Sequence, residues 1–180
     1  MALCTTACAV NLPPAPSAGC GIATRNGGIS KLVFIKCDYT FTDVSDRTEW
    51  LAAVTAGDVV LTGLVLGQKP KGTFTKKRIS SCTPESIVGG EKTITFQDYN
   101  SDPDDCTDIN FYNEIQVNAP LMQFGYYTCD GYFYGPIPSF TMEVDQVIED
   151  NNTGSIYFDG TVSWNAIEMP CGVAVNLDGV

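Results

Sequence analysis

The oxygen-bearing side chains between Asp98 and Asp108 form the segment whose composition points most directly to chemistry. Such oxygens recur at positions 98, 100, 102 and 104, an alternation that resembles a calcium-binding loop. However, Pro103 stands where that loop needs glycine, and Ile109 stands where it needs a bidentate glutamate. We therefore expect a solvated acidic loop rather than a calcium site, and we assign no metal-binding residue.

A second group of candidate residues is basic and surrounds one aromatic ring. The group consists of Lys69, Lys71, Phe74, Lys76, Lys77 and Arg78. An aromatic ring among cations can stack on single-stranded nucleic acid, but five cations in one hairpin are few for such a surface. We favour the interpretation that these are subunit-assembly residues, on a basic hairpin that docks against an acidic surface of another subunit. Nucleic-acid binding is the alternative.

Residue types that commonly carry catalysis are missing or unmarked. The chain contains no histidine, so a nucleophilic cysteine would lack its usual base. The many carboxylates leave glycoside cleavage open, yet no motif marks a particular pair. Neither of the glycine-rich patterns that bind nucleotide phosphates occurs. The sequence therefore predicts a protein that is not an enzyme and that needs no cofactor.

The segment from Gly125 to Gly135 is unusually aromatic. Its rings belong to Tyr126, Tyr127, Tyr132, Phe133 and Tyr134. Such rings can form a flat patch that binds sugars, or they can pack on alternate faces of ordinary strands. We favour strand packing and keep sugar binding as an alternative.

The eight cysteines do not form a recognisable motif. They stand at positions 4, 8, 20, 37, 82, 106, 129 and 171. An even count is compatible with disulfides, but no C-x-x-C pair occurs and the first residues do not resemble a secretory signal. We expect mostly reduced cysteines in a protein that is made in a cytoplasm. No apolar run is long enough to span a membrane.

Charge is divided unevenly along the chain. The formal net charge is −11, which disfavours general binding to nucleic acid. Residues 1–92 carry all ten basic side chains and seven acids, whereas residues 93–180 carry fourteen acids and no base. This asymmetry indicates a molecule with one basic and one acidic surface, although halves of a sequence need not be halves of a structure.

Local signals predict the first elements. Residues 1–30 are rich in proline, alanine, glycine and serine, so we expect a flexible arm. Residues 31–37 read as a strand, and the alternation continues over residues 39–42.

A helix is predicted over residues 47–56. Asp46 and Glu49 have the spacing of a capping box, and Gly57 suits a left-handed stop.

The rest of the chain is expected to be mainly β. Alternating and β-branched runs predict strands at residues 58–66, 73–79, 92–98, 123–134, 140–148 and 154–164. We expect residues 73–79 to pair with residues 58–66, residues 80–91 to form a loop and residues 108–117 to form a short helix. Residues 31–180 should therefore form a single β-sandwich or barrel domain of about seven to nine strands with one or two helices.

Taken together, these features resemble a virion structural protein, most closely a major tail tube protein of tailed bacteriophages. The resemblance rests on the arm, the capped helix, the β-rich body from Asp58 to Trp164 and the basic hairpin near Gln68–Ile79. It implies a β-sandwich that forms hexameric rings. Such rings stack head to tail, contact other virion proteins and conduct DNA as passing cargo through an acidic channel, without specific binding and without a membrane.

Other functions remain open at this stage. The arm and the charge asymmetry would also suit a capsid decoration protein or a tail terminator. A carbohydrate-binding β-sandwich is a further alternative from a different class. The resemblance places the protein in the virion, after synthesis in the cytoplasm of a bacterial host.

Overall fold

A computed structural model of the chain describes residues 27–78, 80–81, 85–102, 104–150 and 154–180. Most of the predicted arm, residues 1–26, therefore lies outside the described residues. The first strand begins at Ile29, so the last two residues of the predicted arm belong to the sheet.

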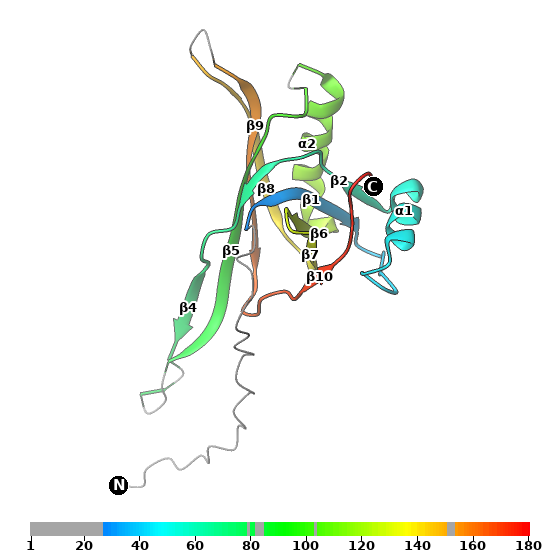
Figure 1. Cartoon of the computed structure of the whole chain (residues 1–180). Helices are drawn as coiled ribbons and strands as arrows, with labels where there is room; N and C mark the ends of the chain where they lie inside the picture. The colour runs from blue at the N-terminus through cyan, green and yellow to red at the C-terminus, as the bar shows by residue number, and fades with distance from the viewer. Residues whose placement is uncertain (1–26, 79, 82–84, 103, 151–153) are drawn as a thin grey trace, which may run out of the picture.

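The described residues form two α-helices, one short 3-10 helix and ten strands (Figure 1). The helices are α1 (Arg47–Ala56), α2 (Cys106–Asn118) and η1 (Ala119–Leu121). The strands are β1 (Ile29–Lys36), β2 (Val59–Leu61), β3 (Leu66–Gln68), β4 (Thr73–Lys77), β5 (Ser86–Asp98), β6 (Met122–Thr128), β7 (Tyr132–Pro138), β8 (Thr141–Ile148), β9 (Ile156–Asn165) and β10 (Gly172–Ala174). Neither α-helix has the length and apolar character that a membrane crossing requires.

All ten strands belong to one open antiparallel sheet, which confirms the mainly β class. The order is β10-β7-β6-β1-β3-β5-β9-β8, with β2 paired to β1 and β4 paired to β5. Strand β3 is a narrow bridge between two halves of the sheet, because only Ile29 and Gly67 connect it to β1. We call these the β1 half (β10, β7, β6, β1 and β2) and the β5 half (β5, β9, β8 and β4).

The main core lies between the two halves of the sheet. Leu32 and Phe124 from the β1 half meet Ile94 and Val162 from the β5 half, and α2 adds Tyr112. The halves run in different directions in Figure 1, so the sheet bends around this core. Aromatic contacts link its layers, since the ring of Phe124 lies near the rings of Phe34, Phe140 and Trp164.

A second core covers the opposite face of the β1 half. Trp50 from α1 is fully buried there, and its ring lies 4.8 Å from that of Phe133. Its indole Nε1 donates to the Val44 carbonyl at 2.8 Å. The C-terminal segment closes the same core, where the Tyr127 hydroxyl donates to the Val175 carbonyl at 3.0 Å. Burial on both of its faces makes β1 the central strand of this half.

Helix α1 has the predicted bounds, but its capping differs in one detail. Asp46 accepts from the Thr48 backbone at 2.8 Å, and Gly57 ends the helix at φ 74°. Glu49 does not complete the predicted box. Its carboxylate instead accepts from the backbone N–H groups of Thr42 and Asp43, at 2.7 and 2.9 Å. These bonds hold residues 39–42 in an irregular segment, so the predicted continuation of the first strand is wrong.

Several predicted strands divide or pair differently. Residues 58–66 form two short strands, β2 and the start of β3, because the Thr62 hydroxyl accepts from the backbone of Leu32 and interrupts the ladder. Residues 73–77 pair with β5 rather than with either of these strands. Residues 86–91 belong to β5, so that part of the predicted loop is wrong. Strand β10 was not predicted.

Candidate functional site

Strand β4 and the first residues of β5 form a two-stranded ribbon that extends away from the body (Figure 1). We call residues 73–77 and 86–90 the ribbon. Thr73 pairs with Glu91 at its base, and Lys77 pairs with Ser86 toward its tip. Every residue of β4 is exposed, and so are the first three residues of β5. The ribbon therefore contributes almost nothing to the core of its own chain.

Apolar side chains on the ribbon are only partly covered by the described residues. Phe74, Ile87 and Val88 are 40%, 45% and 49% exposed. Two-stranded ribbons are marginally stable in water unless they pack on something else. The β5 backbone edge is also open from Ser86 to Gly89, since the ladder with β9 begins at Glu91 and the Ala166 N–H donates to the Gly90 carbonyl. The ribbon thus offers apolar side chains and unpaired backbone groups to a partner.

The six predicted assembly residues lie in two places, and Phe74 belongs to the group on β4. Lys76 and Lys77 lie on β4, Arg78 directly follows it, and all three are exposed. Lys69 and Lys71 lie instead in the connection between β3 and β4. The predicted hairpin near Gln68–Ile79 is therefore incorrect in its pairing, because its second strand comes from residues 86–91.

Phe74 joins the ribbon to the body. It pairs with Gly90, where a Cβ would lie 2.6 Å from the Ala166 carbonyl oxygen and 2.9 Å from the Phe74 ring. Only glycine allows this approach. The ammonium of Lys92 lies 3.9 Å from the centroid of the Phe74 ring, a cation–π contact. That contact covers part of the ring that nucleic-acid stacking would need.

Lys92 is the residue that sequence reasoning missed. It is 5% exposed and occupies the inward row of β5 that continues through Ile94 and Phe96. Because side chains alternate along a strand, the predicted inward positions of Ile94 and Phe96 already implied an inward lysine at position 92. This alternation was the sequence signal that could have identified Lys92.

The opposite end of the molecule carries a second projecting hairpin, formed by β8 and β9 (Figure 1). Its outer part has the cross-strand pair Ile148 and Ile156, which are 67% and 38% exposed. Its exposed charged residues are all acidic: Glu143, Asp145, Glu149 and Asp150. A basic ribbon and an acidic hairpin therefore lie at opposite ends of one sheet. The charge asymmetry of the sequence is also an asymmetry in space.

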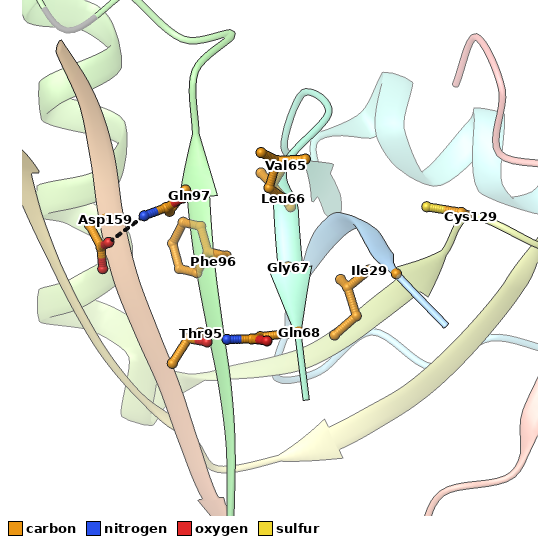
Figure 2. A pocket seen from close by; sticks show the side chains of 11 residues that line it. Ile29, Val65, Leu66, Gly67, Gln68, Thr95, Phe96, Gln97, Cys129 and Asp159 are labelled. Carbon is orange, nitrogen blue, oxygen red and sulfur yellow. Dashed lines mark hydrogen bonds between the residues drawn. The ribbon is translucent and has the colours of Figure 1, made fainter. Parts of the chain in front are cut away.

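A hollow lined by both polar and apolar side chains lies at the seam beside β3. It has a volume of about 560 Å³ and includes Asp159 and Cys129 in its wall. Figure 2 shows these two side chains at opposite ends of the hollow. Gln97 donates to the Asp159 carboxylate at 3.1 Å. The lining therefore provides no nucleophile beside a base, and it supports no catalytic assignment.

The acidic segment is partly structural, contrary to the expected solvated loop. Asp98 is completely buried and accepts from the Tyr112 hydroxyl at 2.6 Å and from the Ser101 hydroxyl at 2.5 Å. Backbone N–H groups of Asn100 and Ser101 donate to its other oxygen at 2.8 and 3.1 Å. Burial, followed by the bond to Asp98, raises the pKa of Tyr112. Asp98 thus anchors α2 to the sheet.

The aromatic run and the cysteines have ordinary positions. Tyr126, Tyr127 and Phe133 are buried in the cores, as strand packing requires, whereas Tyr132 and Tyr134 are half-buried. Four cysteines are described, Cys37, Cys106, Cys129 and Cys171, and all are exposed and free. The other four lie outside the described residues. Among the described side chains, no group of three or more cysteine or carboxylate residues is placed to hold a metal ion.

Comparison with known proteins identifies no relative. No family model matches the chain, and no curated protein or solved structure matches it significantly.

Proposed function

We propose that this protein is a self-assembling structural subunit whose copies join head to tail, as in the tail tube of a bacteriophage virion. The observation that carries the proposal is the ribbon. Most of it is exposed, its β5 backbone edge is open from Ser86 to Gly89 and it is apolar in part, so the described residues supply little surface that stabilises it beyond its base at Phe74 and Gly90. A neighbouring copy would supply that surface.

Opposite charge at the two ends favours a second copy as the partner. Head-to-tail assembly needs two different and complementary faces on each subunit. The ribbon carries Lys76 and Lys77, with Arg78 directly after it, while the β8–β9 hairpin carries exposed acids and no base. Exposed ion pairs contribute only ~0–1 kcal/mol each, so charge would set orientation and rate. Apolar contacts and strand addition would carry most of the affinity.

The tail tube is the favoured member of this class because of the resemblance described above. It implies hexameric rings, an acidic channel and a location in the virion. Fourteen acids without a base in residues 93–180 would make such a channel repel DNA phosphates and prevent DNA from adhering during passage. Capsid decoration and tail termination are the alternatives that the same ribbon would serve.

Electron microscopy of the purified chain tests the proposal. We expect hollow tubes or stacked rings in concentrated wild-type protein. The matched variant replaces residues 74–90 with Asn-Gly, a two-residue turn that joins the paired residues Thr73 and Glu91. It should stay folded, as circular dichroism would show, and should remain monomeric. Wild-type protein that stays monomeric at every concentration, or a ribbonless variant that still polymerises, would contradict head-to-tail assembly. Single rings without tubes would favour a terminator.

A further inference from the structure

Two lysine side chains meet in a small pocket at the base of the ribbon. The pocket has a volume of about 110 Å³. Its walls are formed by Lys69, Lys92, Tyr126, Tyr134, Trp164, Glu168, Met169 and Pro170. The rings of Tyr126 and Tyr134 stack at 5.0 Å with planes 8° apart, so part of the wall is flat and aromatic. Burial raises the pKa of Tyr126 to about 12, which keeps its hydroxyl protonated and uncharged.

Packing fixes the position of the Lys92 ammonium. Its stem continues the inward row of β5, next to Trp164 on the paired strand. The ammonium lies 3.9 Å from the Phe74 ring centroid. At Gly72, an added Cβ would lie 2.6 Å from Lys92 Cδ, so the backbone closes on the stem from that side. The charge is therefore held in place before any ligand arrives.

The electrostatics of the pocket are unfavourable for the chain alone. Burial and the nearby charge of Lys92 both lower the pKa of Lys69. Among the described residues, the one ion pair joins Lys36 and Asp58 at 2.7 Å, so neither pocket lysine has a described carboxylate within 4.0 Å. Glu168 borders the pocket without reaching either ammonium at that distance. The repulsion between two ammonium groups held in this way is relieved when an anion binds between them.

We propose that this pocket binds a carboxylate group, held between the ammonium groups of Lys69 and Lys92. Each ammonium can donate up to three hydrogen bonds, which suits the two oxygens of a carboxylate. The aromatic wall suits the methylene groups next to such a group. A volume of about 110 Å³ suits the end of an acidic side chain or a small organic acid, and excludes a nucleotide. An acidic side chain and a free organic acid share this chemistry.

Nuclear magnetic resonance of the dispersed chain tests the binding. Met169 lies in the pocket wall and is 79% exposed, so its labelled methyl group reports on the site. Acetate and glutarate are titrated at constant ionic strength against chloride. We expect a saturable shift of the Met169 methyl in the wild type and in Lys71→Met, a control that removes an exposed lysine outside the pocket. Lys92→Met and Lys69→Met should weaken binding at least tenfold.

A thermal unfolding measurement separates a binding role from a structural one. Methionine keeps most of the stem and removes one of two mutually repelling charges. The midpoint of Lys69→Met, which leaves the Lys92–Phe74 contact in place, should therefore equal or exceed that of the wild type, even though binding is lost. Lysines that served only stability would instead give a lower midpoint.

Three results would overturn the proposal. These are no saturable shift in the wild type, an equal shift in Lys92→Met, or a response to chloride as strong as that to the carboxylates. Sedimentation velocity then identifies the source. If saturating glutarate raises the protein concentration for half-association at least tenfold, the occupant is an acidic side chain of a second copy. Unchanged association identifies a free carboxylate. Because the titration uses dispersed chains, a failure to assemble would contradict the proposed function and leave this result intact.

Discussion

The two ends of β5 behave as different kinds of structure although they belong to one strand. From Gly90 to Asp98 every second residue is buried, and this end pairs with β9 over the main core. From Ser86 to Val88 every residue is exposed, and the strand has only the exposed β4 beside it. One end therefore stabilises the fold, and the other end is available to a partner. Stability and assembly should respond to different mutations.

The largest effect on stability is expected at the buried end of β5. Asp98→Ala would leave the Tyr112 hydroxyl and two backbone N–H groups without their buried acceptor. Each such loss costs about 1–3 kcal/mol, so the free energy of unfolding should fall by roughly 3 kcal/mol or more. Urea denaturation followed by circular dichroism measures this change.

Asp104→Ala is the matched control for that experiment. Asp104 is an exposed acid of the same segment, so its loss should change the free energy of unfolding by less than about 0.5 kcal/mol. Equal effects at positions 98 and 104 would show that Asp98 is not an anchor.

The same contrast explains which parts of the fold were predictable. Residues 92–98 alternate between apolar and polar side chains, and this local signal predicted both the strand and the inward positions of Ile94 and Phe96. Within residues 86–91 the buried position is a glycine, Gly90, and Gly89 and Gly90 together resemble a break. Helix α1 was predictable for the same reason as residues 92–98, since its end signals are local.

Strand pairing and the pocket depended on contacts between distant residues. The sequence around β4 does not indicate whether its partner strand precedes it, as predicted, or follows it at residues 86–91. Loop length alone does not select a neighbour. The convergence of Lys69 and Lys92 also depends on that pairing. The burial of Asp98 depends on the docking of α2, which no pattern within residues 98–108 could reveal.

The largest effect on assembly is expected from the ribbon. Lys76→Glu with Lys77→Glu reverses the charge that faces the acidic end of a neighbour, so the rate of polymer growth should fall at least tenfold. The thermal midpoint should stay within about 2 °C of the wild type, because both side chains are exposed. Light scattering measures growth, and calorimetry measures the midpoint.

A charge swap provides the control for this double variant. Asp145→Lys with Asp150→Lys changes two exposed acids of the β8–β9 hairpin region and should also slow growth. When subunits of the two variants are mixed, or when all four changes are combined in one chain, growth should recover. Without recovery, the two ends do not face each other in the assembly.

A smaller effect is expected from the apolar tip of the β8–β9 hairpin. Ile148 and Ile156 face each other across the two strands, and both are exposed, Ile148 more than Ile156. If this pair becomes buried between subunits, Ile148→Ser with Ile156→Ser should raise the protein concentration for half-assembly about three- to tenfold, since buried apolar area contributes roughly 25 cal/mol per Å². Leu51→Ser is the control, since Leu51 is 42% exposed on α1, which packs on the β1 half rather than on either hairpin. Equal effects would indicate a general loss of apolar surface.

Salt should have the smallest effect on the rate of polymer growth. The sign of that effect tests most directly whether the ribbon faces the acidic hairpin of a neighbour. At physiological ionic strength the attraction between the ribbon and an acidic hairpin is screened beyond about 8 Å, and at 1 M salt beyond about 3 Å. Raising the salt concentration should therefore slow wild-type growth by a factor of about two to five, because apolar contacts persist. In the Lys76→Glu, Lys77→Glu variant the facing charges repel, so the same salt should accelerate growth. Opposite salt slopes for the two proteins would tie assembly to this pair of surfaces, whereas parallel slopes would leave the basic ribbon as a solvated loop.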